Sequence, residues 1–142
     1  MRQAVLCLSI LLAAAPPFVA AAAKADRCLD LKKPHATATV SGVLTARLFA
    51  GPPDFESVAG GDAMERALIL ELPRAICADD GEFIDGTTQI DRVQVSSTVP
   101  SLLDELNAAV GRQVTLSGEA FGAQSGHHHA PLVLFADKIT GR

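Results

Sequence analysis

Alternating apolar and polar residues predict five β-strands along this chain. In each segment the apolar side chains recur at every second position, which is the period of a strand with one buried face. Segments rich in proline, glycine or acidic residues separate the strands and predict loops. The predicted strands are residues 35–49, 66–73, 90–96, 112–121 and 130–140.

Between the third and fourth predicted strands, the apolar period changes to that of an α-helix. The segment SLLDELNAAVG, residues 101–111, carries its apolar residues three or four positions apart. Ser101 is suited to cap the N-terminus of this helix, and Gly111 is suited to end it. The predicted buried face consists of Leu102, Leu103, Leu106 and Val110.

The order β-β-β-α-β-β predicts an all-β protein with one helix, folded as a small five-stranded OB-like barrel. Gly42 lies in the middle of the long first strand, where glycine often marks a sharp bend. A small barrel needs such a bend because one strand must pair with both halves of the sheet. A generic antiparallel sandwich is the alternative, but it would not explain the position of the helix. We expect one domain, residues 24–142.

The first 23 residues have the features of a secretory signal peptide. Arg2 is followed by an apolar run at residues 4–15 and then by small residues that suit a cleavage site. The run is too short for a membrane-spanning helix, which needs about 20 residues. We therefore expect a periplasmic or secreted protein whose mature chain does not span a membrane. Cleavage is predicted after Ala22, Ala23 or Ala25.

The cysteines predict one disulfide bond in the mature protein. Cys7 would leave with the signal peptide, so that Cys28 and Cys77 remain. An even number of cysteines in an exported chain favours a structural disulfide. Two separate thiols are the alternative. A redox pair is disfavoured because the chain has no C-x-x-C spacing.

Charge and composition argue against nucleic-acid binding. Without Arg2 the chain has 11 basic and 16 acidic residues, a net charge of about −5. An acidic surface repels nucleic acids and anionic lipids. The chain also contains no Trp or Tyr on which bases could stack.

Two segments resemble an uncharacterised family of exported bacterial proteins, a domain of unknown function. FAGPPDFESVAGGDAMERALILELPRAIC, residues 49–77, carries its GPPxFES…GDxxE…IC pattern, and GRQVTLSGEAFGAQSGHHHAPLVL, residues 111–134, carries its closing GHHH[TA]PxVL-type pattern. Ala130 stands where threonine is common in the family. The resemblance implies bacterial origin and export, and it implies no activity.

The three adjacent histidines form a candidate metal site. If the segment is extended, His127 and His129 share one face and His128 points the other way. Two imidazoles on one side of a strand can bind Zn²⁺ or Cu²⁺. His35 is the candidate third ligand, because an OB barrel places the start of the first strand near the end of the fourth. Alternatively, the loop histidines cap backbone groups or lie in solvent.

The long loop between the first and second predicted strands is a candidate contact surface. It carries the carboxylates of Asp54, Glu56, Asp62 and Glu65, which could dock a basic partner or bind Ca²⁺, although they lack EF-hand spacing. Alternatively, the loop is solvated, and Asp62 and Glu65 only make turn hydrogen bonds. Phe55 is either a plug tucked beneath the loop or an exposed contact.

No residue pattern predicts catalysis. The serines lack a G-x-S-x-G turn, and no cysteine has a reactive context. We therefore predict a non-enzymatic exported binding or accessory module that contacts an unknown protein or small ligand in the periplasm. One alternative is a periplasmic metal-binding protein that uses the histidine loop. Another is an inhibitor or immunity-type protein that binds its partner through the acidic loop.

Overall fold

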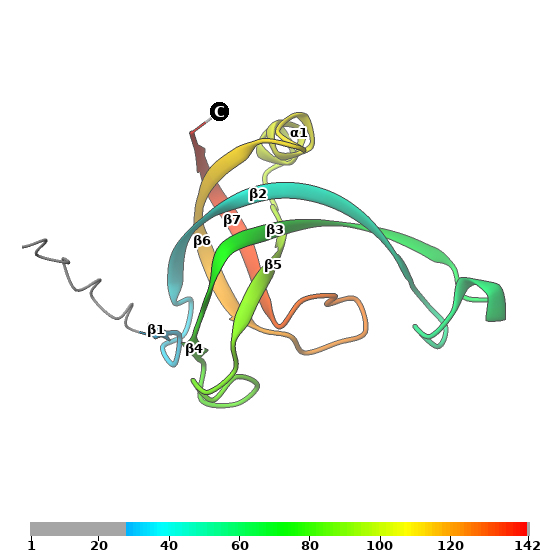
Figure 1. Cartoon of the computed structure of the whole chain (residues 1–142), viewed down its shortest axis with the longest axis horizontal. Coiled ribbons are helices and arrows are strands. Elements are labelled where there is room, and N and C mark those ends of the chain that lie inside the picture. Colours follow the sequence, from blue (N-terminus) through cyan, green and yellow to red (C-terminus); the bar gives the residue numbers. More distant parts are fainter. Residues whose placement is uncertain (1–27, 142) are drawn as a thin grey trace, which may run out of the picture.

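The five predicted strands are confirmed in the computed structural model, which describes residues 28–141 (Figure 1). The predicted signal peptide lies outside these residues. The single α-helix, α1, lies between the third and fourth barrel strands, as predicted. The barrel elements are β2 (Thr37–Ala50), β3 (Met64–Ile76), β5 (Ile90–Ser96), α1 (Pro100–Ala108), β6 (Gln113–Gly122) and β7 (Leu132–Thr140).

The strands close into a barrel in the order β2-β3-β5-β7-β6, and β6 pairs with β2 to complete the ring. The β5–β7 pair is parallel, and the other four barrel pairs are antiparallel. Parallel neighbours need a crossover connection, and the chain between β5 and β7 supplies it through α1 and β6. This topology confirms the OB-like barrel and excludes the sandwich.

Gly42 is the point at which β2 changes partner. The strand pairs with β6 over residues 37–43 and with β3 over residues 43–50. A Cβ atom on Gly42 would lie 2.2 Å from the carbonyl oxygen of Glu71. Glycine is required here because the backbone of β3 passes too close for any side chain. The predicted role of this glycine in the bent first strand is confirmed.

We expect Gly42→Ala to lower the free energy of unfolding by about 1–3 kcal/mol, because the new methyl group would push β2 and β3 apart. The measurement is urea-induced unfolding. Gly60→Ala is the matched control, since its added Cβ would make only ordinary contacts, the nearest at 3.5 Å from Ser57. Equal stability of the Gly42 variant and the wild type would contradict the close approach.

The N-cap of helix α1 lies two residues earlier than predicted. It is Val99, which makes no side-chain capping bond, and Pro100 is the first helical residue. Ser101 is therefore inside the helix, and its predicted capping role is wrong. Proline is favoured at this position because its fixed φ suits a first helical turn.

The buried face of the helix also differs from the prediction at its C-terminal end. Leu102 and Leu106 are buried as predicted, and Leu103 is half-buried. Val110 is 37% exposed, and Ala109 is buried in its place. The reason is that the helix ends at Ala108, so the helical period no longer places Val110 on the core side.

A disulfide bond joins Cys28 to Cys77, as predicted. It lies beside a small parallel pair formed by β1 (Leu29–Asp30) and β4 (Ala78–Asp79). These two-residue strands were not predicted, because they are too short to show a period. The disulfide ties the first described residues to the end of β3.

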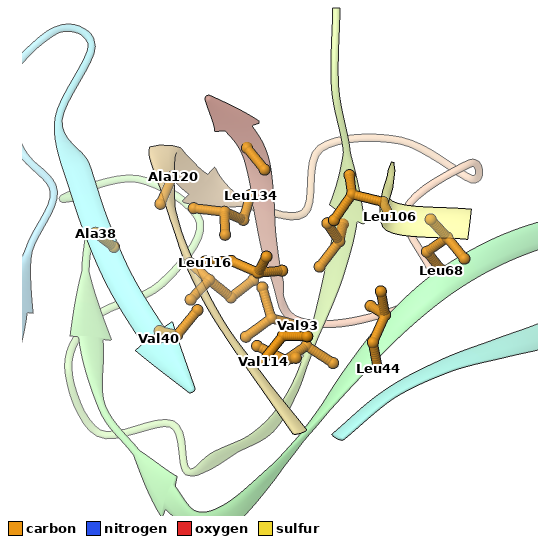
Figure 2. Packing of buried hydrophobic residues seen from close by; sticks show 14 of the residues in the cluster. Ala38, Val40, Leu44, Leu68, Val93, Leu106, Val114, Leu116, Ala120 and Leu134 are labelled. Atoms are coloured by element: carbon orange, nitrogen blue, oxygen red, sulfur yellow. The ribbon is translucent and has the colours of Figure 1, made fainter. Parts of the chain in front are cut away.

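The main hydrophobic core fills the barrel and is covered at one end by α1 (Figures 1 and 2). Figure 2 shows Leu44, Val93, Leu116 and Leu134 from four strands pointing into it, together with Leu106 from the helix. Within residues 28–141, no helix is both long and apolar enough to cross a membrane.

A smaller apolar cluster lies on the other face of β3. It contains Ala67, Ile69 and Ala130, with Phe49 packed against it. Both faces of β3 are therefore covered at this point, by the barrel core on one side and by the loop that follows β6 on the other.

Candidate functional site: the arm and the histidine loop

Strands β2 and β3 continue beyond their barrel pairings as a two-stranded hairpin, here called the arm (residues 44–67), whose base still packs into the barrel core through Leu44. The β2–β6 pairing ends at Val43, and the β3–β5 pairing begins at Leu68. Beyond these residues the two strands pair only with each other. Figure 1 shows the arm projecting from the barrel on the side from which the loop between β6 and β7 also projects. That loop, residues 123–131, is the histidine loop.

The tip of the arm (residues 51–63) is organised around Asp62. This side chain is only 8% exposed, and it accepts hydrogen bonds from the backbone N–H groups of Asp54, Glu56 and Ser57, each at 2.8 Å. The N–H groups of Asp54 and Ser57 are the main cause of a lowered pKa for Asp62, which burial partly opposes. A one-turn 3-10 helix, Val58–Gly60, completes the tip. Asp62 thus holds the tip together, in agreement with the turn-bonding alternative.

We expect Asp62→Asn to loosen the tip, because an amide offers one acceptor oxygen where the carboxylate offers two. Amide exchange at Glu56 and Ser57 should become faster by about tenfold. The lowered pKa gives the sign of the pH effect. The carboxylate bonds contribute fully above its ordinary value of 3.8 and are lost as the pH falls through the lower folded value.

The measurement is hydrogen exchange followed by NMR. The control is Asp54→Asn, because no described group bonds the Asp54 carboxylate. If Asp62→Asn and the control exchange alike, Asp62 does not organise the tip.

Phe55 joins the tip to the histidine loop. Its backbone has a left-handed φ of 59°, which is uncommon for a bulky residue. Its half-buried ring lies edge-on to the ring of His127, with the centroids 4.8 Å apart. The ring also lies so close to Gly126 that a Cβ there would be 2.7 Å from it. Phe55 is therefore a plug between two loops, which was one of the two predicted alternatives.

The carboxylate of Glu65, on β3, lies between two histidine rings. Nδ1 of His127 is 3.0 Å from one of its oxygens and 3.1 Å from the other. Nε2 of His129 is 3.4 Å from the second oxygen, at ion-pair distance but without a hydrogen bond. The His129 side chain is 9% exposed, and its ring stacks on Phe49 at a centroid distance of 4.1 Å. Residues that the sequence placed in two separate loops thus meet at the Glu65 carboxylate.

Gln94, on β5, holds the backbone of the histidine loop. Its Nε2 donates a hydrogen bond to the carbonyl of His127 at 2.9 Å, and its Oε1 accepts one from the N–H of His129. These two bonds fix the backbone from which the imidazole rings of His127 and His129 point toward the arm. Gln94 was not predicted, because in the segment IDRVQVS it resembles any outward-facing polar residue of a strand.

His128 points away from the other two histidines, although the segment is a turn, closed by the His128 N–H bond to the Ser125 carbonyl, and not the extended strand that was considered. Its Nδ1 accepts a hydrogen bond from the N–H of Gln124 at 2.8 Å, and its ring packs edge-on to Phe121. Burial, followed by the nearby charges of His127 and His129, lowers the pKa of His128. For this histidine the backbone-capping alternative is correct.

His35 does not join the other candidate metal ligands. It bonds instead to Glu119 of β6, with Nδ1 3.1 Å from the carboxylate. The start of β2 does pair with the end of β6 as predicted, through Thr37 and Glu119. However, the residues that meet His127 and His129 belong to the arm, so Glu65 takes the place predicted for His35. In the described part of the chain, no three His, Cys, Asp or Glu side chains are arranged to hold a metal ion.

The outermost acidic side chains of the tip are free. Asp54 and Glu56 are exposed, and no described side chain or backbone group bonds their carboxylates. Exposed apolar side chains lie on the same arm, namely Leu48, Val58 and Met64, which are 63%, 45% and 62% exposed. The arm therefore presents two unpaired negative charges beside apolar surface, on a framework held by Asp62.

Comparison with known proteins finds a family model that matches one segment of the chain. No curated protein matches the chain. The matched segment begins in β5 and contains α1, β6, the histidine loop and β7, whereas the arm lies before it. Residues 92–140 match the family model described as Domain of unknown function (DUF4431), which confirms the predicted resemblance to an uncharacterised family over this part of the chain.

Proposed function

We propose that this protein is an exported, non-enzymatic binding module whose contact surface is the arm tip together with the histidine loop. One observation carries the proposal. The tip holds the unpaired carboxylates of Asp54 and Glu56 outward, on a backbone that Asp62 fixes with three hydrogen bonds. The kind of partner that fits this surface is a protein with a basic patch, and an enzyme inhibited by the tip would be one example.

The physical basis is pre-organisation and charge. A loop already held in one conformation loses little entropy when it binds, so more of the contact energy appears as affinity. Unpaired carboxylates attract a basic surface and speed the encounter, in a manner that salt weakens. OB barrels commonly bind through the loops that correspond to the arm tip and the histidine loop, which is support by analogy with the fold.

Export is supported by two features. The opening residues have the order of a signal peptide, and disulfide bonds such as Cys28–Cys77 persist mainly in oxidising compartments. The periplasm is therefore the compartment in which to search for the partner.

The test is a pull-down from periplasmic extract, with the mature protein as bait, at low salt and at about 0.3 M salt, where the Debye length is shorter. We expect a partner that is retained at low salt and lost at high salt. Asp54→Asn with Glu56→Gln should abolish its recovery. Asp104→Asn with Asp137→Asn removes the same charge from exposed positions elsewhere and should leave recovery unchanged. Equal recovery with both double variants would refute the proposed surface.

The second candidate function is binding of Zn²⁺ or Cu²⁺ by the histidine loop. It is favoured by the convergence of His127 and His129 on Glu65, and it requires these side chains to rearrange around a common point. Metal affinity should then fall below about pH 6.5, where protons compete for imidazole. The test is the metal content of tag-free protein purified from the periplasm. This candidate fails if His127→Ala with His129→Ala leaves the metal content unchanged.

A further inference from the structure

A hollow opens in the barrel wall where β2 and β3 part. The β2–β3 pairing ends at Val43 and Glu71, and the β3–β5 pairing is interrupted between Glu71 and Ile76. Residues 72–75 of β3 therefore pair with neither neighbouring strand. The resulting hollow has a volume of about 300 Å³. It includes Leu29 of β1, and Figure 1 shows β1 at the end of the barrel away from the arm.

The floor of the hollow is apolar. Leu29, Leu72 and Ile76 are half-buried and pack against the barrel core, and buried Val40 lies beside them. Two hydroxyl side chains also line the hollow, but both are bonded to strand β6: Thr39 to Ser117 and Ser41 to Thr115. The floor is therefore suited to a hydrocarbon group.

Among the residues that the structure describes, Arg74 is the only charged one that lines this hollow, and it is exposed. No described carboxylate pairs with it, whereas the Arg47 guanidinium lies 2.6 Å from Glu71. In a chain with 16 acidic residues, a hollow whose described lining has one unpaired cation and no carboxylate favours an anion. A guanidinium can bind a carboxylate through two parallel hydrogen bonds.

We propose that this hollow binds a small amphipathic carboxylate, such as a single-chain fatty acid. The hydrocarbon chain would occupy the floor between β2 and β3, and the carboxylate would bond to Arg74. A volume of about 300 Å³ is at the lower end of the range for small-molecule sites, so it suits one chain. The proposal is independent of the arm, because no arm residue lines the hollow.

The test is isothermal titration of the mature protein with decanoate. We expect saturable binding at one site, and about fourfold tighter binding for each methylene added from hexanoate to decanoate. Arg74→Gln should weaken decanoate binding by about tenfold or more, because the charge-assisted bonds are lost. Decanol, which carries no charge, should bind the wild type and the Arg74 variant equally. Lys138→Gln, which removes an exposed cation on β7, should change decanoate affinity less than about twofold.

A second variant tests the location. Leu72→Trp should fill the hollow and remove binding of both decanoate and decanol, with folding checked by circular dichroism and thermal unfolding. Four results would overturn the proposal: no saturable binding, decanol binding to the wild type as tightly as decanoate, equal losses in Arg74→Gln and Lys138→Gln, or unchanged binding in a folded Leu72→Trp protein.

Discussion

Replacing Leu106 by alanine is expected to lower the free energy of unfolding by about 2–5 kcal/mol. Leu106 is fully buried and belongs to the main core. Figure 2 shows its side chain pointing from α1 into this core. The loss combines the transfer energy of the deleted methyl groups with the cavity left at the covered end of the barrel. Urea unfolding measures it as a shift of the midpoint at an unchanged slope.

Val110→Ala is the control for Leu106. The sequence places both residues on one helical face, whereas the structure leaves Val110 37% exposed. We expect the Val110 variant to lie within about 0.5 kcal/mol of the wild type. Similar losses in the two variants would show that α1 continues to Val110 and packs differently.

Removing the disulfide by Cys28→Ser with Cys77→Ser is expected to cost about 4 kcal/mol in the chain-entropy model. The bond closes a loop with a sequence separation of 49 residues, and this closure restricts the unfolded chain. It also ties β1 to β4 beside the end of β3. Thermal and urea unfolding should both report the loss, and chemically reduced wild type should unfold like the double variant. A double variant as stable as the oxidised wild type would contradict this account.

The strands were predictable because barrel packing imposes a period of two on each of them. Residues 90–96 match β5 at both ends, and the other four strand predictions differ from the structure by at most three residues at either end. The two errors in α1 have a local cause. Pro100 starts the helix without a side-chain cap, and the helix ends before Val110.

The candidate site was only partly predictable from the sequence. The histidines are consecutive, and the acidic residues share one loop, so each group was visible as a pattern. Their relation was not visible. Glu65 meets residues 62 and more positions away along the chain, and Gln94 bonds residues 33 and 35 positions away.

The sequence by itself determined the order of strands and helix along the chain, because each element shows a local period. It also determined the glycine at which β2 changes partner, through the missing side chain, and the disulfide, through the even cysteine count. Tertiary structure alone decided that His35 pairs with Glu119, that Asp62 is internal to the tip, and that Glu65 lies between His127 and His129. The physical reason is barrel closure. Pairing between strands that are distant in the sequence sets which side chains meet. No local sequence pattern predicts how far the arm extends past the barrel.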